Sequence, residues 1–221
     1  MKIILCGYEG SKRILATSSY LLNKYVKGFD IKFLNFGHYD GDLFTGEYVS
    51  LAYEQIGGGD SWSKYIYNYV SKLTDRLVIL GVDDHLIGEP VDMETFNKLK
   101  DLVKGDVKSA RLCGCDWCPN EKKIIQDGII TFKQTADYLV TGQYTIWDRE
   151  ALLEILKPVR SVWRFELDGT NEYRGRGWQV IAAVNPPFKY DDISALSAYR
   201  KEVNLNGLKE EDLNYINNNL L

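Results

Sequence analysis

Two carboxylates and an imidazole, Asp83, Asp84 and His85, directly follow a short apolar run and are well placed for chemistry. The run, residues 77–82, is rich in β-branched side chains, which is typical of a strand buried in a parallel sheet. Ligands of α/β sheets bind at the edge where such strands end. We expect Asp83 and His85 to bind Mg²⁺ or Mn²⁺ bridging two phosphates, and Asp84 to contact a ribose hydroxyl or the metal's water shell. The alternative is that the Asp pair only caps and solubilises a loop.

A third carboxylate, Glu166, lies among aromatic residues further along the chain. Such surroundings can shift the pKa of a carboxyl group for catalysis. The alternative is a surface ion pair between Glu166 and Arg164 or Arg160. Arg174 and Arg176, each followed by glycine, form a basic and flexible stretch that could clamp phosphate or be a solvated loop.

Three thiols within six residues, Cys113, Cys115 and Cys118, resemble a metal-binding motif. A structural zinc site needs four ligands, and this cluster supplies three. We therefore favour an ordinary loop with reduced thiols over a zinc site. The other candidate ligands are distant in the sequence: Cys6, His38 and His85.

Composition places the chain among soluble globular proteins. Its 221 residues suit one domain or one domain with a small appendage, and 45% hydrophobic and 26% charged residues are ordinary values. A net charge of −4 argues against nucleic acid as the main partner. No stretch approaches the roughly 20 apolar residues of a membrane span. The apolar run at the N-terminus, residues 1–6, is too short for a signal peptide, so we expect a cytoplasmic protein with reduced cysteines.

The elements that would position these residues alternate between strands and helices, which predicts an α/β fold. Asp127-Gly128 indicates the turn of a hairpin. Gly7 and Tyr8 begin the glycine-flanked turn after the first strand, where a nucleotide base or phosphate commonly binds. Glycines 57–59 either approach a ligand or form a linker, and residue 60 or 61 caps the next helix. The expected strands are 2–6, 31–36, 77–82, 107–112, 136–146 and 180–184, with a short element at 48–53 and a hairpin at 122–132. The expected helices are 14–25, 62–73, 92–103 and 149–156.

The domain organisation that we expect is one domain over residues 1–190 and a helical C-terminal segment over residues 191–221. That segment contains two helices, about 192–203 and 208–217. The Asn-rich end is typical of a frayed terminus or of a linker, so the chain could belong to a larger multi-domain protein.

The order of several motifs resembles a family of small nucleotide-sugar glycosyltransferases with the GT-A fold. The motifs are a helix carrying Trp62, a strand ending in Asp-Asp-His, Glu89-Pro-Val-Asp with its helix, Gln143-Tyr-Thr-Ile-Trp with a Leu-rich helix, and Trp163-Arg-Phe-Glu before Gly169. The likeness covers about residues 60–190. Within this family the chain resembles the N-terminal glycosyltransferase domain of a multi-domain chlorella-virus protein. If this chain is viral, we expect it to be located in the host cytoplasm.

The resemblance implies a mixed, mostly parallel Rossmann-like sheet and a metal held by Asp-x-Asp, where this chain has His85 in the third position. It also implies that Glu166 deprotonates the acceptor hydroxyl in an inverting reaction. In a retaining reaction Gln143 or Asp168 could instead face the reacting carbon. We assign catalysis to Glu166 and Asp168. Donor binding is assigned to Gly7, Tyr8, Asp60, Trp62, Asp84, Arg174 and Arg176. Acceptor binding is assigned to Gln143, Trp147 and Trp163, although the two Trp residues could equally be core.

We expect a metal-dependent enzyme that moves a sugar from a nucleoside-diphosphate sugar, with a UDP-sugar favoured, to a hydroxyl of a glycan acceptor. One alternative is a sugar-nucleotide nucleotidyltransferase, which normally carries a Gly-rich signature with Arg and Lys that residues 7–13 match poorly. The other is a carbohydrate- or nucleotide-binding domain without turnover.

Overall fold

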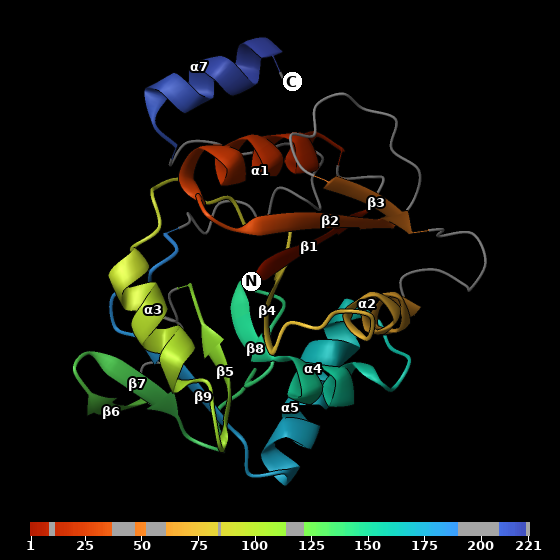
Figure 1. Cartoon of the computed structure of the whole chain (residues 1–221), viewed down its shortest axis with the longest axis vertical. Coiled ribbons are helices and arrows are strands. Elements are labelled where there is room, and N and C mark those ends of the chain that lie inside the picture. The colour runs from red at the N-terminus through yellow and green to blue at the C-terminus, as the bar shows by residue number, and fades with distance from the viewer. Residues whose placement is uncertain are drawn as a thin grey trace.

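The described residues form one mixed sheet with helices on both faces (Figure 1). The structure is a computed structural model that describes residues 1–8, 12–36, 47–51, 61–83, 85–113, 122–189 and 208–219. The strands are β1 (Lys2–Tyr8), β2 (Asp30–Phe36), β3 (Glu47–Leu51), β4 (Leu77–Val82), β5 (Val107–Arg111), β6 (Lys122–Gln126), β7 (Ile129–Phe132), β8 (Thr145–Asp148) and β9 (Gln179–Ala183). The helices are α1 (Lys12–Tyr25), α2 (Trp62–Val70), α3 (Met93–Leu102), α4 (Arg149–Leu156), α5 (Val162–Gly175) and α7 (Glu210–Asn219). Within the described ranges, no helix has the length and apolar character that crossing a bilayer requires.

Most strands of the sheet run in one direction. Their order is β3-β2-β1-β4-β8-β5-β9-β7-β6. β1 pairs in parallel with β2 and β4, β2 with β3, and β5 with β9. β8 is antiparallel to both β4 and β5, and β7 is antiparallel to both β9 and β6. Seven of these nine strands therefore share one direction, which confirms the predicted α/β fold with a mixed, mostly parallel sheet.

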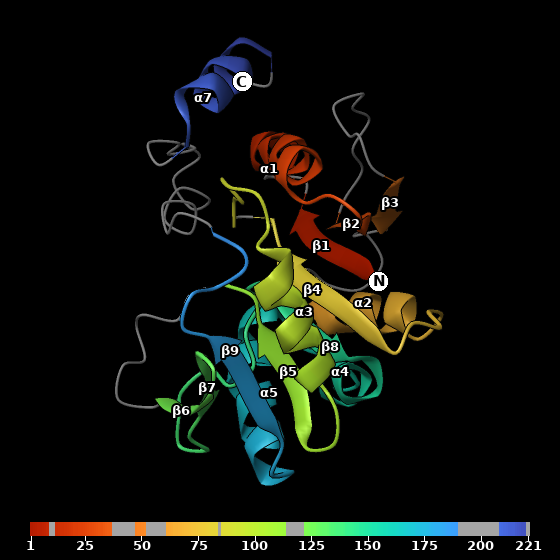
Figure 2. The same ribbon diagram turned by 60° about the vertical axis from the view of Figure 1, so that its left-hand side comes forward.

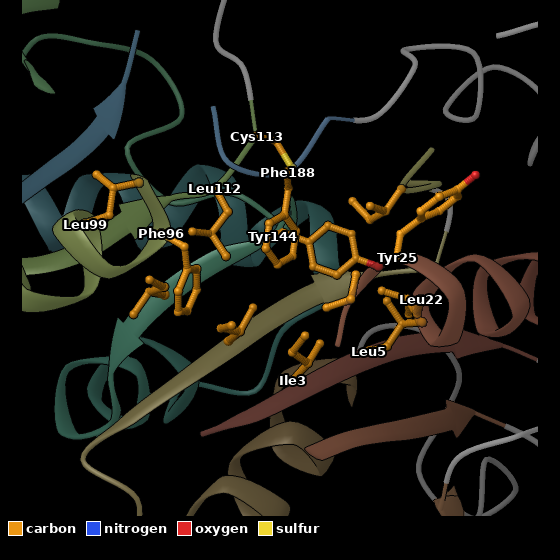
Figure 3. Packing of buried hydrophobic residues seen from close by; sticks show 14 of the residues in the cluster. Ile3, Leu5, Leu22, Tyr25, Phe96, Leu99, Leu112, Cys113, Tyr144 and Phe188 are labelled. Atoms are coloured by element: carbon orange, nitrogen blue, oxygen red, sulfur yellow. The ribbon is translucent and has the colours of Figure 1, made fainter. Parts of the chain in front are cut away.

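Alternating side chains give the sheet two apolar faces. Ile3 of β1 lies on the face that packs against α1, α3 and α7, and the next residue, Ile4, lies on the face that packs against α2, α4 and α5. Figure 2 shows α3 and α5 on opposite sides of the sheet. Figure 3 shows the first face, where the Tyr144 and Phe188 rings lie 5.4 Å apart. Both faces are therefore covered, as a mostly parallel sheet requires.

Most elements expected from the sequence are confirmed. The strands at 2–6, 31–36, 77–82, 107–112 and 180–184 correspond to β1, β2, β4, β5 and β9, and the short element near residue 48 is β3. The Asp127-Gly128 turn joins β6 to β7, and both residues have positive φ (40° and 76°). Asp92 begins α3 as predicted, with its side chain accepting from the amides of Glu94 and Thr95. Glycines 57–59 and the helix expected at 192–203 lie outside the described residues.

The predicted core strand over residues 136–146 is wrong for most of its length. Only its last two residues are extended, as the start of β8 (Thr145–Asp148), and residues 133–144 follow an irregular path. Tyr138 has a left-handed φ of 53°, which no strand residue adopts. The irregular path has a physical reason: the backbone of this segment is hydrogen-bonded to α5 instead of to a neighbouring strand, as when the Val140 amide donates to Thr170 Oγ1 at 3.0 Å.

The first half of the stretch predicted to be a flexible basic loop, residues 174–177, belongs to a helix. α5 has 14 residues, begins at the N-cap Ser161 and buries Phe165, Gly169 and Tyr173 at a spacing of four residues. Gly169 weakens the helical signal in the sequence. It is required by packing, because a Cβ there would lie 2.9 Å from Ile155 Cγ2 of α4. The prediction of a flexible loop is therefore wrong for residues 174 and 175.

The C-terminal helix α7 is bound to the outer side of α1 (Figure 1). Its Asp212 is fully buried and accepts hydrogen bonds from Tyr20, Lys24 and Tyr25 of α1. Burial alone would raise the pKa of this carboxyl, but the bonds from Lys24, Tyr25 and Tyr20 outweigh it and lower the pKa. The ring of Tyr215 stacks on Tyr20 at 4.3 Å. The helix predicted at 208–217 is confirmed, and the division of the chain at residue 190 stays a prediction.

Gly81 in β4 lies directly under the ring of Tyr144. A Cβ at this position would be 2.7 Å from Tyr144 Cδ1 and 2.8 Å from Cε1, closer than van der Waals contact allows. Because Tyr144 is fully buried, its ring has no open space into which it can move.

We predict that Gly81→Ala lowers the free energy of unfolding by about 1–3 kcal/mol, as overpacking of a core typically does. Gly175→Ala is the matched control, since a Cβ there meets nothing within 4 Å, and it should be neutral or slightly stabilising. Urea unfolding of both variants measures the difference. Equal midpoints for Gly81→Ala and the wild type would contradict the described packing.

Candidate functional site

The candidate site lies at the sheet edge where β1 and β4 end and β8 begins. Asp83 follows β4 directly, and its amide donates to the carbonyl of Cys6 in β1 at 2.9 Å. This bond prolongs the β1–β4 pairing by one residue and fixes where Asp83 leaves the sheet. Asp83 and His85 are both largely buried, with 7% and 9% of their surface exposed. The two side chains are thus held close to the sheet, as the sequence predicted for the end of a buried strand.

The loop that follows His85 is fixed on several sides. Ile87 is buried in the core, and the Gly88 amide donates to the carbonyl of Lys189 at 3.1 Å. Further on, the Val91 amide donates to the carbonyl of Tyr25 in α1 at 3.3 Å. These bonds tie the loop to the end of the β9 segment and to α1, so the Asp83–His85 turn is anchored on both sides.

The donor set at this turn suits a metal ion that shares its ligands with a substrate. Asp83 supplies carboxylate oxygens and His85 an imidazole nitrogen. Within the described part of the chain, no three His, Cys, Asp or Glu side chains converge on one point, so a closed all-protein site is absent there. Mg²⁺ is commonly held by one or two protein groups together with phosphates and water. The residues present fit an ion of this half-open kind.

Glu166 of α5 lies beside the end of β4. Its Oε1 accepts hydrogen bonds from the Gly142 amide at 2.7 Å and from Thr141 Oγ1 at 3.2 Å. A Cβ on Gly142 would lie 3.3 Å from Val82 Cγ1 and 3.6 Å from Glu166 Oε1, so the last residue of β4, the turn at Gly142 and the carboxylate meet at one point. Both described hydrogen bonds reach the same oxygen, which leaves Oε2 as the atom able to take a proton from a substrate.

Burial raises the pKa of the Glu166 carboxyl above its ordinary value. The hydrogen bonds from Gly142 and Thr141 and the charges of His85 and Arg111 oppose this rise without cancelling it. A carboxyl group with a raised pKa is a stronger base when ionised, which is what proton abstraction requires. His85 lies close enough to Glu166 to affect the pKa of its carboxyl group.

One row of α5 side chains binds the segment between β7 and β8. Glu166, Thr170 and Arg174 are spaced four residues apart, so they lie on one side of the helix. Arg174 donates to the carbonyls of Gln134 and Ala136, the Val140 amide donates to Thr170, and the Gly142 amide donates to Glu166. We call these contacts the α5 ladder. The ladder explains why this segment is irregular yet fixed, and it gives Glu166 a structural role in addition to any chemical one.

Three further residues predicted for binding are close to this site. Gly7 lies in β1 directly after Cys6, whose carbonyl holds the Asp83 amide. Gln143 follows Gly142, and its amide donates to Thr141 Oγ1 at 3.3 Å. Trp163 lies one turn before Glu166 on α5 with 57% of its surface exposed. Tyr8 ends β1, and its side chain lies outside the described residues.

Three predicted residues point or lie away from the site. Asp168 forms an ion pair with Arg164 at 3.1 Å on the outer surface of α5, about 200° around the helix from Glu166. Arg174 lies eight residues from Glu166, about 12 Å along the helix, and belongs to the α5 ladder. Arg176 pairs with Glu154 at 3.2 Å at the far end of α5. The predicted catalytic role of Asp168 and the predicted phosphate clamp are not supported by this geometry. The ion pair expected as an alternative for Glu166 is also wrong, since Arg164 pairs with Asp168 and Arg160 pairs with Glu172.

Two tryptophans predicted to bind substrate are core residues. Trp147 is fully buried and packs against Phe165 and Tyr173. Trp62, with 7% of its surface exposed, packs against Phe165 with a centroid distance of 5.1 Å. Neither ring presents a face to solvent, so acceptor binding by Trp147 and donor binding by Trp62 are corrected to core packing.

Five of the residues singled out in the sequence lie outside the described part of the chain: His38, Asp60, Asp84, Cys115 and Cys118. Cys113 is buried in the first apolar face.

Arg111 is the residue near the site that the sequence did not reveal. It ends β5, has 1% of its surface exposed, and affects the charge of Glu166. A charged residue at the end of an expected strand normally faces solvent, so its sequence position gave no signal. The polar residue two places earlier, Ser109, is also buried, so both lie on the α5 face.

The comparisons with known proteins show the fold. No protein-family model and no curated protein matches this sequence. HddC from Yersinia pseudotuberculosis matches with a TM-score of 0.56 and 14% identity, over 90% of this chain and 96% of that chain. A cytidylyltransferase from Leptospira borgpetersenii matches with a TM-score of 0.46 and 11% identity, over 98% and 93%. The glycosyltransferase GlyE of Streptococcus pneumoniae matches with a TM-score of 0.43 and 13% identity, and this chain spans 37% of its length.

We predict that Glu166→Gln raises the melting temperature at pH 8. Glutamine keeps the oxygen that accepts from Gly142 and Thr141 but carries no buried charge. Because the pKa of Glu166 is raised, its protonation stabilises the folded wild type at pH values below 4.5, the ordinary pKa of the group. This stabilisation is lost as pH rises through the raised pKa. The advantage of the variant should therefore shrink as pH falls, which thermal unfolding from pH 4 to 8 measures. A variant less stable than the wild type at pH 8 would contradict the conclusion that burial determines the pKa shift of Glu166.

Proposed function

We propose that this protein is a glycosyltransferase that moves a sugar from a nucleoside-diphosphate sugar, with a UDP-sugar favoured, to a hydroxyl of a glycan acceptor. The observation that carries the proposal is the position of Glu166. Its carboxylate is partly buried, fixed at Oε1 by two donors, and next to the end of β4, where Asp83 and His85 leave the sheet.

The donor would bind across the ends of β1 and β4. Gly7 lets a nucleotide approach the backbone closely because it has no side chain. Asp83 and His85 are the residues that would hold Mn²⁺ or Mg²⁺, which when bound neutralises the charge of the diphosphate leaving group. The acidic Asp83 needs such a cation beside it, since a carboxylate alone would repel the diphosphate.

Glu166 is the proposed general base. The acceptor hydroxyl transfers its proton to Oε2 of Glu166 while its oxygen forms a bond to the anomeric carbon of the donor. The bond from that carbon to the diphosphate breaks, and the electron pair leaves with the nucleoside diphosphate. Trp163 supplies an exposed aromatic face for the acceptor sugar. For a retaining reaction, Gln143 is the residue close to this point, whereas Asp168 is on the outer surface of the helix.

The same fold could support a sugar-nucleotide nucleotidyltransferase, and the need for a base separates the two reactions. In that reaction the nucleophile is a sugar phosphate, which is largely ionised at neutral pH and needs no proton acceptor. A sugar hydroxyl, in contrast, must lose its proton. A binding domain without turnover needs neither a base nor a metal beside it.

We predict that the protein binds UDP more tightly with Mn²⁺ than without it, and that Asp83→Ala abolishes this metal-dependent part. Calorimetric titration with UDP, GDP and dTDP, each with and without Mn²⁺, measures the effect. Glu89→Ala serves as the control, because it removes from the same loop an exposed carboxylate that pairs with Lys189. Failure of all three nucleotides to bind would overturn the proposal and favour a sugar-binding domain.

We predict that Glu166→Gln lowers the rate of sugar transfer by about 10²–10⁴, the usual contribution of a general base, and leaves donor affinity unchanged. The comparison variant is Asp168→Asn, which removes a carboxylate from the outer surface of the same helix and should keep transfer. The assay measures nucleoside diphosphate release with and without a panel of glycan acceptors. Transfer at the wild-type rate by Glu166→Gln would remove Glu166 from the mechanism. Formation of a nucleotide sugar from a sugar phosphate and a nucleoside triphosphate, unaffected by this variant, would identify a nucleotidyltransferase.

A further inference from the structure

Arg111 occupies an unusual place for a charged residue. It ends β5 on the sheet face covered by α5, with 1% of its surface exposed. Its guanidinium lies 4.4 Å from the ring centroid of Phe132 in β7, and Nη2 donates to the carbonyl of Tyr138. Burying a cation is costly unless other groups compensate it, so a fully buried arginine calls for a specific role.

The carbonyl that Arg111 binds belongs to a residue in an unfavourable conformation. Tyr138 has a φ of 53°, and a non-glycine residue is strained in this left-handed region. Its side chain does not offset this strain by burial, because 41% of its surface is exposed. The hydrogen bond from Arg111 is therefore a contact that can hold Tyr138 in this conformation.

The path of the chain beyond Tyr138 leads to Glu166. Leu139 enters the core, the Val140 amide donates to Thr170, and Thr141 and Gly142 donate to Glu166 Oε1. The direction in which the chain leaves Tyr138 thus decides where the two donors to Glu166 lie. This route contains four residues, so a change in the backbone at Tyr138 is carried to the carboxylate without a flexible linker between them.

We propose that Arg111 is a positioning residue for Glu166: by holding Tyr138 in its left-handed conformation it fixes Leu139–Gly142, which in turn fixes the Glu166 carboxylate. The mechanical part of this inference stands on the described contacts alone. Its consequence for sugar transfer rests on the proposed function. The charge of Arg111 acts in the same sense, since it favours the ionised form of Glu166, which is the form that accepts a proton.

Backbone amide exchange in D₂O tests the mechanical part without any substrate. Arg111→Met should speed exchange of the Val140 and Gly142 amides at least about tenfold, because their segment loses its anchor. The matched control is Arg149→Met, since Arg149 also donates to a backbone carbonyl, that of Leu73, at the opposite end of β8. The control should leave these two amides unchanged. Wild-type exchange rates at both amides in Arg111→Met would overturn the proposal.

Tyr138→Gly tests the role of the strained residue. Glycine adopts the left-handed conformation at no steric cost, so adding Tyr138→Gly to Arg111→Met should recover part of the lost protection at Gly142. No recovery would mean that Arg111 acts otherwise than through Tyr138 and would overturn the proposal. If Arg111→Met does not fold, Arg111→Lys replaces it, because lysine keeps the charge but cannot stack flat on Phe132 while donating in the same geometry. Unchanged exchange at Gly142 in Arg111→Lys would again overturn the proposal.

Kinetics separate this inference from the proposed function. Arg111→Met should lower kcat of transfer by about 10–100-fold with donor KM unchanged, as expected when a catalytic group is misplaced. It should cause no further loss in the Glu166→Gln background, because both changes act on the same group. Additive losses would overturn the positioning role while leaving Glu166 as base. Faster amide exchange in Arg111→Met together with full transfer by Glu166→Gln would remove Glu166 as the base of the proposed reaction and leave the positioning of Glu166 intact.

Discussion

The α5 ladder is the constraint on which the candidate site depends. Glu166, Thr170 and Arg174 bind a segment that makes no strand pairing of its own, and so they decide its path. A segment of this kind would otherwise leave backbone donors and acceptors unpaired in the interior, which is costly. Because the ladder ends at Glu166, the same carboxylate completes the fold and faces the end of β4. The Glu166 side chain therefore has a structural role and, in the proposed reaction, a chemical one. Its Oε1 accepts the two hydrogen bonds that fix the segment, and Oε2 would accept the proton of the substrate.

The sheet order brings the parts of the site together. β8 lies between β4 and β5 and is antiparallel to both, so its first residues lie at the same edge as the last residues of its neighbours. Val82 at the end of β4, Arg111 at the end of β5 and the turn at Gly142 before β8 consequently meet there. The close contact between Gly81 and the Tyr144 ring secures this arrangement. A site assembled from strand ends is more rigid than one built on a long loop, which suits the positioning of reacting groups.

The sequence predicted what depends on local pattern. The apolar run before Asp83, the amphipathic helices and the Asp127-Gly128 turn carry signals within a few residues, and the structure confirms them. It did not predict α5, because Gly169 and Gly175 weaken the helical signal and the packing that requires Gly169 comes from a different helix. The burial of Trp62 and Trp147 and the role of Arg111 were also out of reach, since they depend on contacts between residues far apart in the chain. Glu166 was singled out by its aromatic neighbours and the family resemblance supplied its expected role, whereas its hydrogen-bond partners were visible only in the structure.

The central place of β8 has a consequence for how the protein is made. During synthesis β4 and β5 emerge well before β8, which completes the pairing of both, and α5 follows later still. Until then the sheet has an open edge at β4, and such edges are where growing or partly folded chains associate wrongly. The ribosome must release most of the chain before this gap closes. The candidate site is accordingly among the last parts to form, and its presence reports that the whole sheet has folded.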